Sequence, residues 1–284
     1  PIYVKDTKKE KEINLPLPGQ SPFIRGTKAS GSVVNSWEIS QQLRHANPEE
    51  INRIVLKDQN QGVSNFSVIL DQATRNRRNP DLSADGFDQA NGLSVCHQED
   101  IAKLLKEVDL SKVAFQFNTG LASLPFVSLL FACLQAEKGS ISRIKGNLIN
   151  DPVAQLLVEG ELQNDLTDIY NEIAICTKWL INNAPEFKAI GIDGRIYRES
   201  GGSATQELAF ILASGVGMIK QLLGHGLTIE EIGQSITLQL SIGSDYFMEI
   251  AKFRAVRSLW AKVIGAFGGD ESSQKVKITA SSMS

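Results

Sequence analysis

The segment Tyr246-Phe-Met-Glu-Ile-Ala-Lys-Phe-Arg-Ala-Val-Arg-Ser-Leu-Trp-Ala-Lys-Val263 carries the clearest helical pattern in the chain. Its apolar residues recur at helical spacing, which is typical of an amphipathic helix with one face against a core. The residues of this predicted stripe are Phe247, Ile250, Phe253, Val256, Trp260 and Val263. The charged residues Glu249, Lys252, Arg254 and Arg257 fall largely outside it. Such helices are common, so the pattern predicts a place in a core or an interface and indicates no function by itself.

Strand-like and helical patterns alternate through the rest of the chain. Short apolar runs predict strands at 65–70, 113–117, 144–149, 189–192, 235–240 and 276–280. Helical patterns separate them, at 48–61, 99–107, 121–137, 166–182, 203–223 and 245–266. Helix starts are marked by Asn47-Pro48 before two acids, and by capping boxes at Ser203–Gln206 and Thr228–Glu231.

This alternation predicts a parallel sheet covered by helices. An open, doubly wound sheet is favoured by a glycine-rich phosphate loop, but the sequence has neither G-x-G-x-x-G nor a P-loop. We therefore predict an α/β fold of the (β/α)8 TIM-barrel type. About six strands are counted, whereas eight close a barrel. We expect either that the C-terminal part of the barrel is absent from this sequence or that the strand count is wrong.

Composition excludes several function classes. The 284 residues are 42% hydrophobic and 21% charged, with a formal net charge of -3. That balance gives no general attraction to nucleic acid or to an anionic membrane, so we expect neither as a partner. Three separated cysteines fit no metal-ligand spacing and no disulfide framework. No signal peptide is visible, and the apolar run 121–134 is too short to span a bilayer. We expect a cytoplasmic protein.

The chain divides unevenly. Residues 1–36 are rich in Lys, Pro, Gly and Ser, which predicts an N-terminal arm that lies extended across a surface. Residues 37–284 form the predicted barrel domain. The arm, with no core of its own, is a candidate for ordering on association with a partner.

Several motifs, in order and at matching spacing, resemble the methylmalonyl-CoA mutase family. Pro22-Phe-Ile-Arg-Gly26 resembles its Pro-Phe/Tyr-x-Arg/His-Gly motif, and Trp37-Glu-Ile39 its Trp-Thr-Ile. Asn150-Asp151 resembles the Asn-Asp that follows the third strand. The segments 200–210 and 246–263 are similar to two family helices. The resemblance implies an N-terminal (β/α)8 barrel, which holds the acyl-CoA in catalytic members, and a family barrel would continue past residue 284.

The same chain departs from the family where the family does chemistry. Where the family has Arg-Gln-Tyr, this chain has Ser40, Gln41 and Gln42, and where the family has Thr-Ile-Gln, it has Asn147, Leu148 and Ile149. Glu159 stands in place of an arginine, and Arg195 and Ile196 stand in place of a Tyr-His pair. In the family the arginine pairs with a substrate carboxylate, which Glu159 would repel. The tyrosine and histidine donate hydrogen bonds to the thioester oxygen, and the Ile196 side chain cannot. Losing this polar set together argues against catalysis by preorganised hydrogen bonds.

Cobalamin binding is also not expected of this chain. The family ligates cobalt through the histidine of an Asp-x-His motif in a separate C-terminal domain, and the sequence contains no Asp-x-His. We interpret His45, His97 and His225 as surface or capping residues, because lone histidines carry no ligand geometry. We predict no catalytic, cofactor-binding or metal residues here, and expect adenosylcobalamin in a partner subunit.

Two weaker signals remain. The basic run Arg75-Asn-Arg77-Arg78 follows the first predicted strand and could hold CoA phosphates, although a solvated loop is the commoner case. Asp71, Asp151 and Asp193 each follow a strand, and capping or salt bridging is the expected role because no metal-ligand partner is in register with them.

Two function classes follow, with a weaker third. The first is a small, non-catalytic subunit that forms a heterodimer with a homologous catalytic large subunit, the holoenzyme interconverting methylmalonyl-CoA and succinyl-CoA. The second is an active cobalamin-dependent acyl-CoA mutase with altered specificity. The third is a degenerate barrel that binds some other ligand. Acyl-CoA is a possible partner of this chain. The changes at Gln42, Glu159 and Ile196 favour the first.

Overall fold

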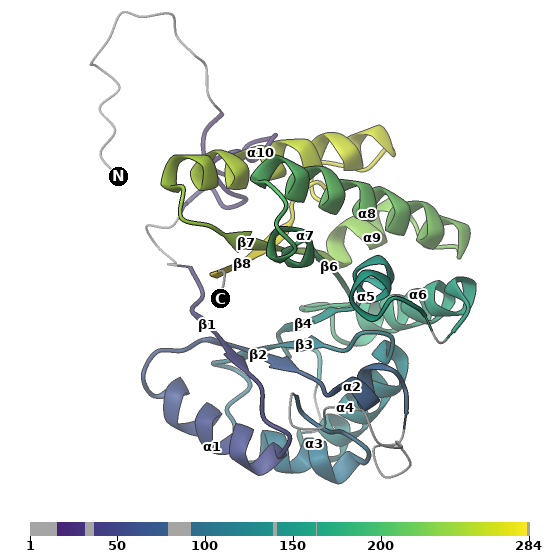
Figure 1. Cartoon of the computed structure of the whole chain (residues 1–284). Helices are drawn as coiled ribbons and strands as arrows, with labels where there is room; N and C mark the ends of the chain where they lie inside the picture. The colour runs from purple at the N-terminus through teal and green to yellow at the C-terminus, as the bar shows by residue number, and fades with distance from the viewer. Residues whose placement is uncertain (1–15, 32–36, 79–91, 139–140, 163, 283–284) are drawn as a thin grey trace, which may run out of the picture.

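A computed structural model describes residues 16–31, 37–78, 92–138, 141–162 and 164–282. Helices surround a curved layer of parallel strands, with α1, α3 and α4 on one side and α8, α9 and α10 on the opposite side (Figure 1). The strands are β1 (Ser40–Leu43), β2 (Asn65–Ile69), β3 (Ala114–Asn118), β4 (Gly146–Ile149), β5 (Phe187–Lys188), β6 (Ile190–Asp193), β7 (Ile236–Ile242) and β8 (Lys277–Ser282). All six predicted strands are confirmed.

The strands pair only in parallel, in the orders β1-β2-β3-β4-β5 and β6-β7-β8. The two sheets join between β4 and β6. There the backbone N–H of Asn150 donates to the carbonyl of Gly191 at 3.2 Å, and the Asn150 side chain accepts from the Gly191 N–H at 3.0 Å. Since β5 and β6 are separated only by Ala189, the strands form one continuous series in chain order. A reversal of strand order, as in a doubly wound sheet, does not occur among the described strands.

The helices connect successive strands. They are α1 (Pro48–Gln59), α2 (Gln72–Arg75), α3 (Gln98–Leu105), α4 (Ser123–Lys138), α5 (Pro152–Glu159), α6 (Leu166–Asn183), α7 (Arg195–Glu199), α8 (Ala204–Gly224), α9 (Ile229–Ser235) and α10 (Tyr246–Ala266). The predicted caps are confirmed: Asn47 accepts from two amides of α1, and Ser203 and Thr228 form capping boxes. These caps satisfy amides that have no partner within the helix.

Side chains from opposite ends of the strand series meet inside the layer. Gln116 on β3 lies 3.4 Å from Gln239 on β7 and 3.4 Å from Thr279 on β8. A flat sheet would separate β3 from β8, so the layer must curve back on itself as in a barrel. Glu38, just before β1, also pairs with Lys277 of β8 at 2.8 Å. The fold is therefore α/β, with parallel strands and the curvature of a partial TIM barrel.

The prediction for α10 was partly wrong. Phe247 is 80% exposed and Ile250 is also exposed, whereas Val256 and Trp260 are buried as expected. Glu249 and Lys252, placed outside the stripe, are buried. The buried face thus runs through 249, 252, 256, 260 and 264 and is rotated from the predicted one. The ring of Trp260 packs on Gly215 of α8, where a Cβ would lie 2.6 Å from it.

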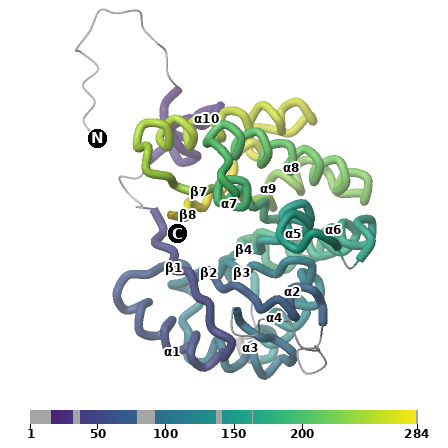
Figure 2. Tube along the Cα trace, viewed as in Figure 1, coloured from purple at the N-terminus to yellow at the C-terminus, as the bar shows by residue number. Residues whose placement is uncertain are grey.

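The described part of the N-terminal arm, 16–31, consists of successive turns rather than an extended segment. It overlaps α10 in the view of Figure 2, and the Ser21 hydroxyl lies 3.5 Å from the side chain of Gln274 in the segment that follows α10. Phe23 is buried there beneath the Lys275 ammonium, 5.6 Å from its ring centroid. Residues 1–15 and 32–36 of the predicted arm are outside the described residues.

Among the described helices, α8 alone is long and apolar enough to cross a membrane by length and composition. Core helices pass the same test. In this fold α8 buries Ile211, Met218, Ile219 and Leu222.

Candidate functional site at the carboxyl ends of the strands

A cavity of about 480 Å³ lies at the carboxyl ends of the strands. Residues at or just after β1, β2, β3, β4, β6 and β8 line it, including Arg44, Asn118, Asp151, Asp193 and Ser281. This is the face on which parallel barrels place their sites, because the connecting loops converge there. The position and the polar lining define the candidate site.

An ion pair closes one side of the cavity. Asp193 ends β6 and accepts from the Arg195 guanidinium at 2.9 and 2.7 Å, and both side chains are buried. Burial alone would lower the pKa of Arg195, but the charge and hydrogen bonds of Asp193 raise it overall. Arg195 is thus held by Asp193 at the end of β6.

Asp151 is a buried acid beside that pair. It caps α5, accepting from the backbone N–H groups of Val153 at 3.0 Å and Ala154 at 3.3 Å. Burial raises its pKa to about 6, and the neighbouring charge of Asp193 adds to the shift. A carboxyl with this pKa titrates near neutrality, but its hydrogen bonds to the helix terminus give it a structural role.

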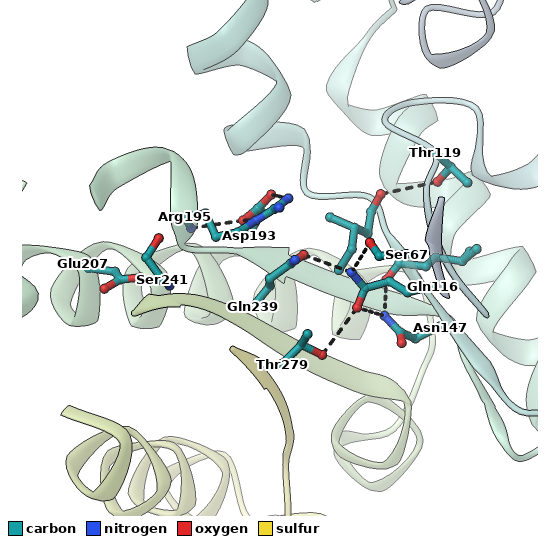
Figure 3. Close-up of polar contacts among 12 residues, drawn as sticks. Ser67, Gln116, Thr119, Asn147, Asp193, Arg195, Glu207, Gln239, Ser241 and Thr279 are labelled. Carbon is teal, nitrogen blue, oxygen red and sulfur yellow. Dashed lines mark hydrogen bonds and ion pairs between the residues drawn. The ribbon is translucent and has the colours of Figure 1, made fainter. Parts of the chain in front are cut away.

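Below the mouth, polar side chains fill the interior between the strands (Figure 3). Gln116 is 2% exposed and occupies the centre. It donates to Ser67 of β2 at 3.1 Å and accepts from Asn147 of β4 at 3.2 Å. Together with its contacts to Gln239 and Thr279, Gln116 links five strands across the interior.

The positions singled out by sequence do not form one catalytic cluster. Gln42 and Ile196 line the mouth cavity, whereas Asn147 belongs to the interior layer. Glu159 is held away from the cavity lining by the side-chain amides of Gln72 at 2.7 Å and Gln155 at 3.1 Å. The singled-out positions that line the mouth therefore carry an amide, aliphatic groups and the Arg195 guanidinium, which is paired with Asp193.

The basic run 75–78 splits in the structure. Arg75 lines the mouth cavity. Arg77 instead pairs with Glu172 of α6 at 2.7 Å and donates to the Leu121 carbonyl at 2.8 Å, which ties α2 to α6. The run therefore does not act as a single phosphate-binding group.

The predicted roles of the three post-strand acids are confirmed. Asp71 caps α2 by accepting from Thr74 at 2.7 Å, Asp151 caps α5, and Asp193 forms a salt bridge with Arg195.

Sequence reasoning missed a buried ion cluster between α8 and α10. Lys252 lies 2.7 Å from Glu207 and 2.6 Å from Glu249, and its ammonium donates to the Ser241 carbonyl at 2.6 Å. Glu207 also accepts from the Ser241 N–H at 2.7 Å. The spacing 249, 252, 256, 260 could have revealed the buried face, but nothing local in the sequence indicates Glu207 as the partner.

Parallel strands in a curved series, with a polar site at their carboxyl ends, define a protein of the barrel type rather than a nucleotide-binding doubly wound sheet. The sequence profile described as Methylmalonyl-CoA mutase matches residues 1–283. The chain therefore belongs to the methylmalonyl-CoA mutase family.

Three relatives illustrate the similarity. Methylmalonyl-CoA mutase of Escherichia coli (strain K12) is 26% identical, over 95% of this chain and 38% of that protein. The methylmalonyl-CoA mutase large subunit of Porphyromonas gingivalis is 28% identical, over 94% of this chain and 38% of that protein. The small subunit from the same organism is 26% identical, over 98% and 41%. The chain thus spans well under half the length of these relatives, and identity does not separate the two subunit types.

The described histidines do not fit a cobalt ligand at the mouth. His225 follows α8, and its Nδ1 lies 2.8 Å from the Gln221 carbonyl. His97 precedes α3, where Asp100 accepts from its backbone N–H at 3.0 Å. None of the three histidines lines the mouth cavity. Within the described part of the chain, no group of three or more His, Cys, Asp or Glu side chains is arranged to hold a metal.

Proposed function

We propose that this chain is the barrel part of a small, non-catalytic subunit of a methylmalonyl-CoA mutase, and that it supports a homologous large subunit. The holoenzyme would interconvert methylmalonyl-CoA and succinyl-CoA, with adenosylcobalamin bound by the large subunit. In the whole protein we infer a closed (β/α)8 barrel, in which the facing edges of β8 and β1 are completed by a further strand.

The observation that carries the proposal is the filled interior. In catalytic members the barrel holds the acyl-CoA, so its interior must admit the ligand. Here Gln116, with Ser67, Asn147, Gln239 and Thr279, forms a hydrogen-bonded layer across five strands. Inserting a ligand would break these bonds and leave buried amides unpaired, at about 1–3 kcal/mol for each group.

The mouth supports the same conclusion. Asp193 and Arg195 neutralise each other, so neither presents a free charge to a substrate. Ile196 offers no hydrogen bond where family enzymes have a histidine. Preorganised donors aimed at the reacting group are the usual source of catalytic acceleration, and the family's Tyr-His pair is replaced here by Arg195, which is bound to Asp193, and by Ile196.

A partner is supported by apolar surface beside the mouth cavity, which shares Val158 and Ile196 with it. The groove between α5, α7 and α8 is lined by Leu157, Val158 and Phe210, and Val158 is 60% and Phe210 48% exposed. Contiguous apolar surface on a folded domain is typical of protein interfaces. Interfaces of obligate subunits commonly bury more than about 2,000 Å² in total.

The test is to mix the full-length protein with its large-subunit homologue and to measure mass by size-exclusion chromatography with light scattering. We expect one peak at the mass of a one-to-one complex and no turnover by this protein alone when cobalamin and methylmalonyl-CoA are supplied. Two separate peaks at micromolar concentration would remove the subunit role. Turnover by this protein alone would instead support an active mutase with altered specificity.

A further inference from the structure

Two arginines face the mouth cavity from the side of β1 and β2. Arg44 directly follows β1, and Arg75 is the last residue of α2, which follows β2. Both line the cavity of about 480 Å³, together with Gln42 and Gln155. Burial is the main cause that lowers the pKa of Arg75, and the positive charge of Arg44 lowers it further.

Arg75 is only partly satisfied. Its side chain is half-buried, and its buried Nε has no hydrogen-bond acceptor among the residues that the structure describes. Burial is the largest cause that lowers the pKa of its guanidinium, while Glu159 and Asp71 act in the opposite direction. A buried N–H group without a partner costs about 1–3 kcal/mol, so an acceptor bound here would be strongly favoured.

The nearby carboxylates do not supply that acceptor. Glu159 is bound by the side-chain amides of Gln72 and Gln155. Asp71 uses one oxygen to cap α2 at Thr74, and its other oxygen is buried without a partner. Asp193 is bound by Arg195. Among the described residues, no ion pair joins Arg75 to a carboxylate.

Arg44 is positioned but not neutralised. With its amide oxygen turned toward the arginine, Gln42 accepts from Nε at 2.8 Å and from one terminal nitrogen at 2.9 Å. The neutral amide orients the guanidinium, and within the described ranges no carboxylate pairs with it. Arg44 itself is exposed to the cavity and to solvent. Two like charges therefore share one side of the cavity.

We infer that the pair Arg44 and Arg75 forms an oxyanion site, which takes a group with two negative charges such as a phosphate monoester. Guanidinium groups bind such oxygens in paired, parallel hydrogen bonds. A dianion matches the two arginine charges, whereas a monocarboxylate neutralises only one. This site goes beyond the proposed function and does not depend on it, because a phosphate could bind whether or not the chain is catalytic.

The test is isothermal titration of the full-length protein with inorganic phosphate at pH 7.5, where the dianion predominates. Acetate at equal ionic strength serves as the monoanion. We expect saturable phosphate binding that Arg75→Gln weakens by about tenfold or more, since a charge-assisted hydrogen bond contributes about 1.5–3 kcal/mol. Acetate should bind at least about tenfold more weakly than phosphate.

Two further variants make the result decisive. Arg53→Gln removes an arginine that is 74% exposed on α1 and paired with Glu50, so phosphate binding should not change. Arg44→Gln alters an exposed side chain. If circular dichroism shows that the Arg75→Gln protein is unfolded, Arg44→Gln takes its place in the comparison with wild type. Absence of saturable phosphate binding, or equal affinities for wild type, Arg44→Gln and Arg75→Gln, would overturn the site. Equal binding of acetate would show a general anion site instead of a dianion site.

Discussion

The α8–α10 layer and the mouth of the strands both bury an ion pair, but they do so over different distances in the sequence. Lys252 joins Glu207, 45 positions away, and the carbonyl of Ser241 at the end of β7. Arg195 at the mouth joins Asp193, only two positions away. The first contact fixes how two helices and a strand pack. The second neutralises local charge and leaves the packing to other groups. We conclude that the long-range polar contacts of this chain mainly fix the packing of its helices and strands, and that few of them lie in the candidate site.

Removing the amine at the centre of the α8–α10 layer should have the largest effect. Lys252→Met leaves Glu207 and Glu249 buried without their cation. Breaking a buried pair in this way costs about 3–5 kcal/mol in the free energy of unfolding, measured by urea denaturation. Lys262→Met, at an exposed position of the same helix, is the control and should change stability by less than about 0.5 kcal/mol. Equal stabilities for the two variants would remove the contrast between the two regions.

At the mouth, the pH dependence of stability should report Asp151. Its pKa is raised to about 6 in the folded protein, so between about pH 4 and pH 6 the native state binds more protons than the unfolded state. Stability should therefore fall as pH rises through that window, by up to about 3 kcal/mol.

Asp151→Asn should flatten this slope, because asparagine also caps helices but does not titrate. The measurement is urea denaturation of both proteins at several pH values. An unchanged slope in Asp151→Asn would mean that other groups control it.

A substitution in the interior amide layer should have an intermediate effect on the free energy of unfolding. Gln116→Leu removes the acceptor of Asn147 and Thr279 while keeping most of the volume. Leaving such buried groups unpaired should lower the free energy of unfolding by about 1–3 kcal/mol in thermal or urea denaturation. Gln234→Leu, at an exposed position of α9, provides the comparison. A stabilised Gln116→Leu protein would show that the layer does not contribute to the fold.

The smallest change in stability is expected from alanine substitutions at two glycines of α8, Gly215 and Gly217. A Cβ at Gly215 would lie 2.6 Å from the Trp260 ring, whereas nothing lies within 4 Å of one at Gly217. Gly215→Ala should therefore lower stability by about 1 kcal/mol net, since overpacking outweighs the gain in helix propensity. Gly217→Ala should raise it by about 0.5–1 kcal/mol. Differential scanning calorimetry would detect the opposite shifts, and shifts of the same sign would contradict the close packing of Trp260.

The sequence predicted much of the fold because the buried strands are apolar runs and the helix caps have specific side chains. It missed β1, since Ser40-Gln-Gln-Leu43 is too polar to read as a strand. It also missed α5, although Asp151-Pro152 is a standard helix start. Both omissions lowered the strand and helix count from which the fold was predicted.

The site was harder to predict than the fold. Gln116 and Gln239 each sit in an apolar run, and nothing local indicates that they meet across the interior. The burial of Lys252 likewise depends on Glu207 in another helix. Such contacts follow from the curvature of the sheet, which is a property of the whole chain. The family resemblance indicated that the catalytic positions had changed, but it did not indicate which side chains fill the interior between the strands.

The filled interior is the central claim, and binding of methylmalonyl-pantetheine tests it most directly. This compound keeps the acyl and pantetheine portions of the substrate and lacks the CoA phosphates. Because its acyl group carries a carboxylate that arginines at the mouth can bind, the signals to follow are those of the interior amides. Protein-observed NMR would follow the side-chain amide signals of Gln116, Asn147 and Gln239 during a titration of the full-length protein. We predict no saturable change up to millimolar concentration. Saturable shifts of these three amides at micromolar concentration would show that the interior opens to a substrate, and would contradict the account.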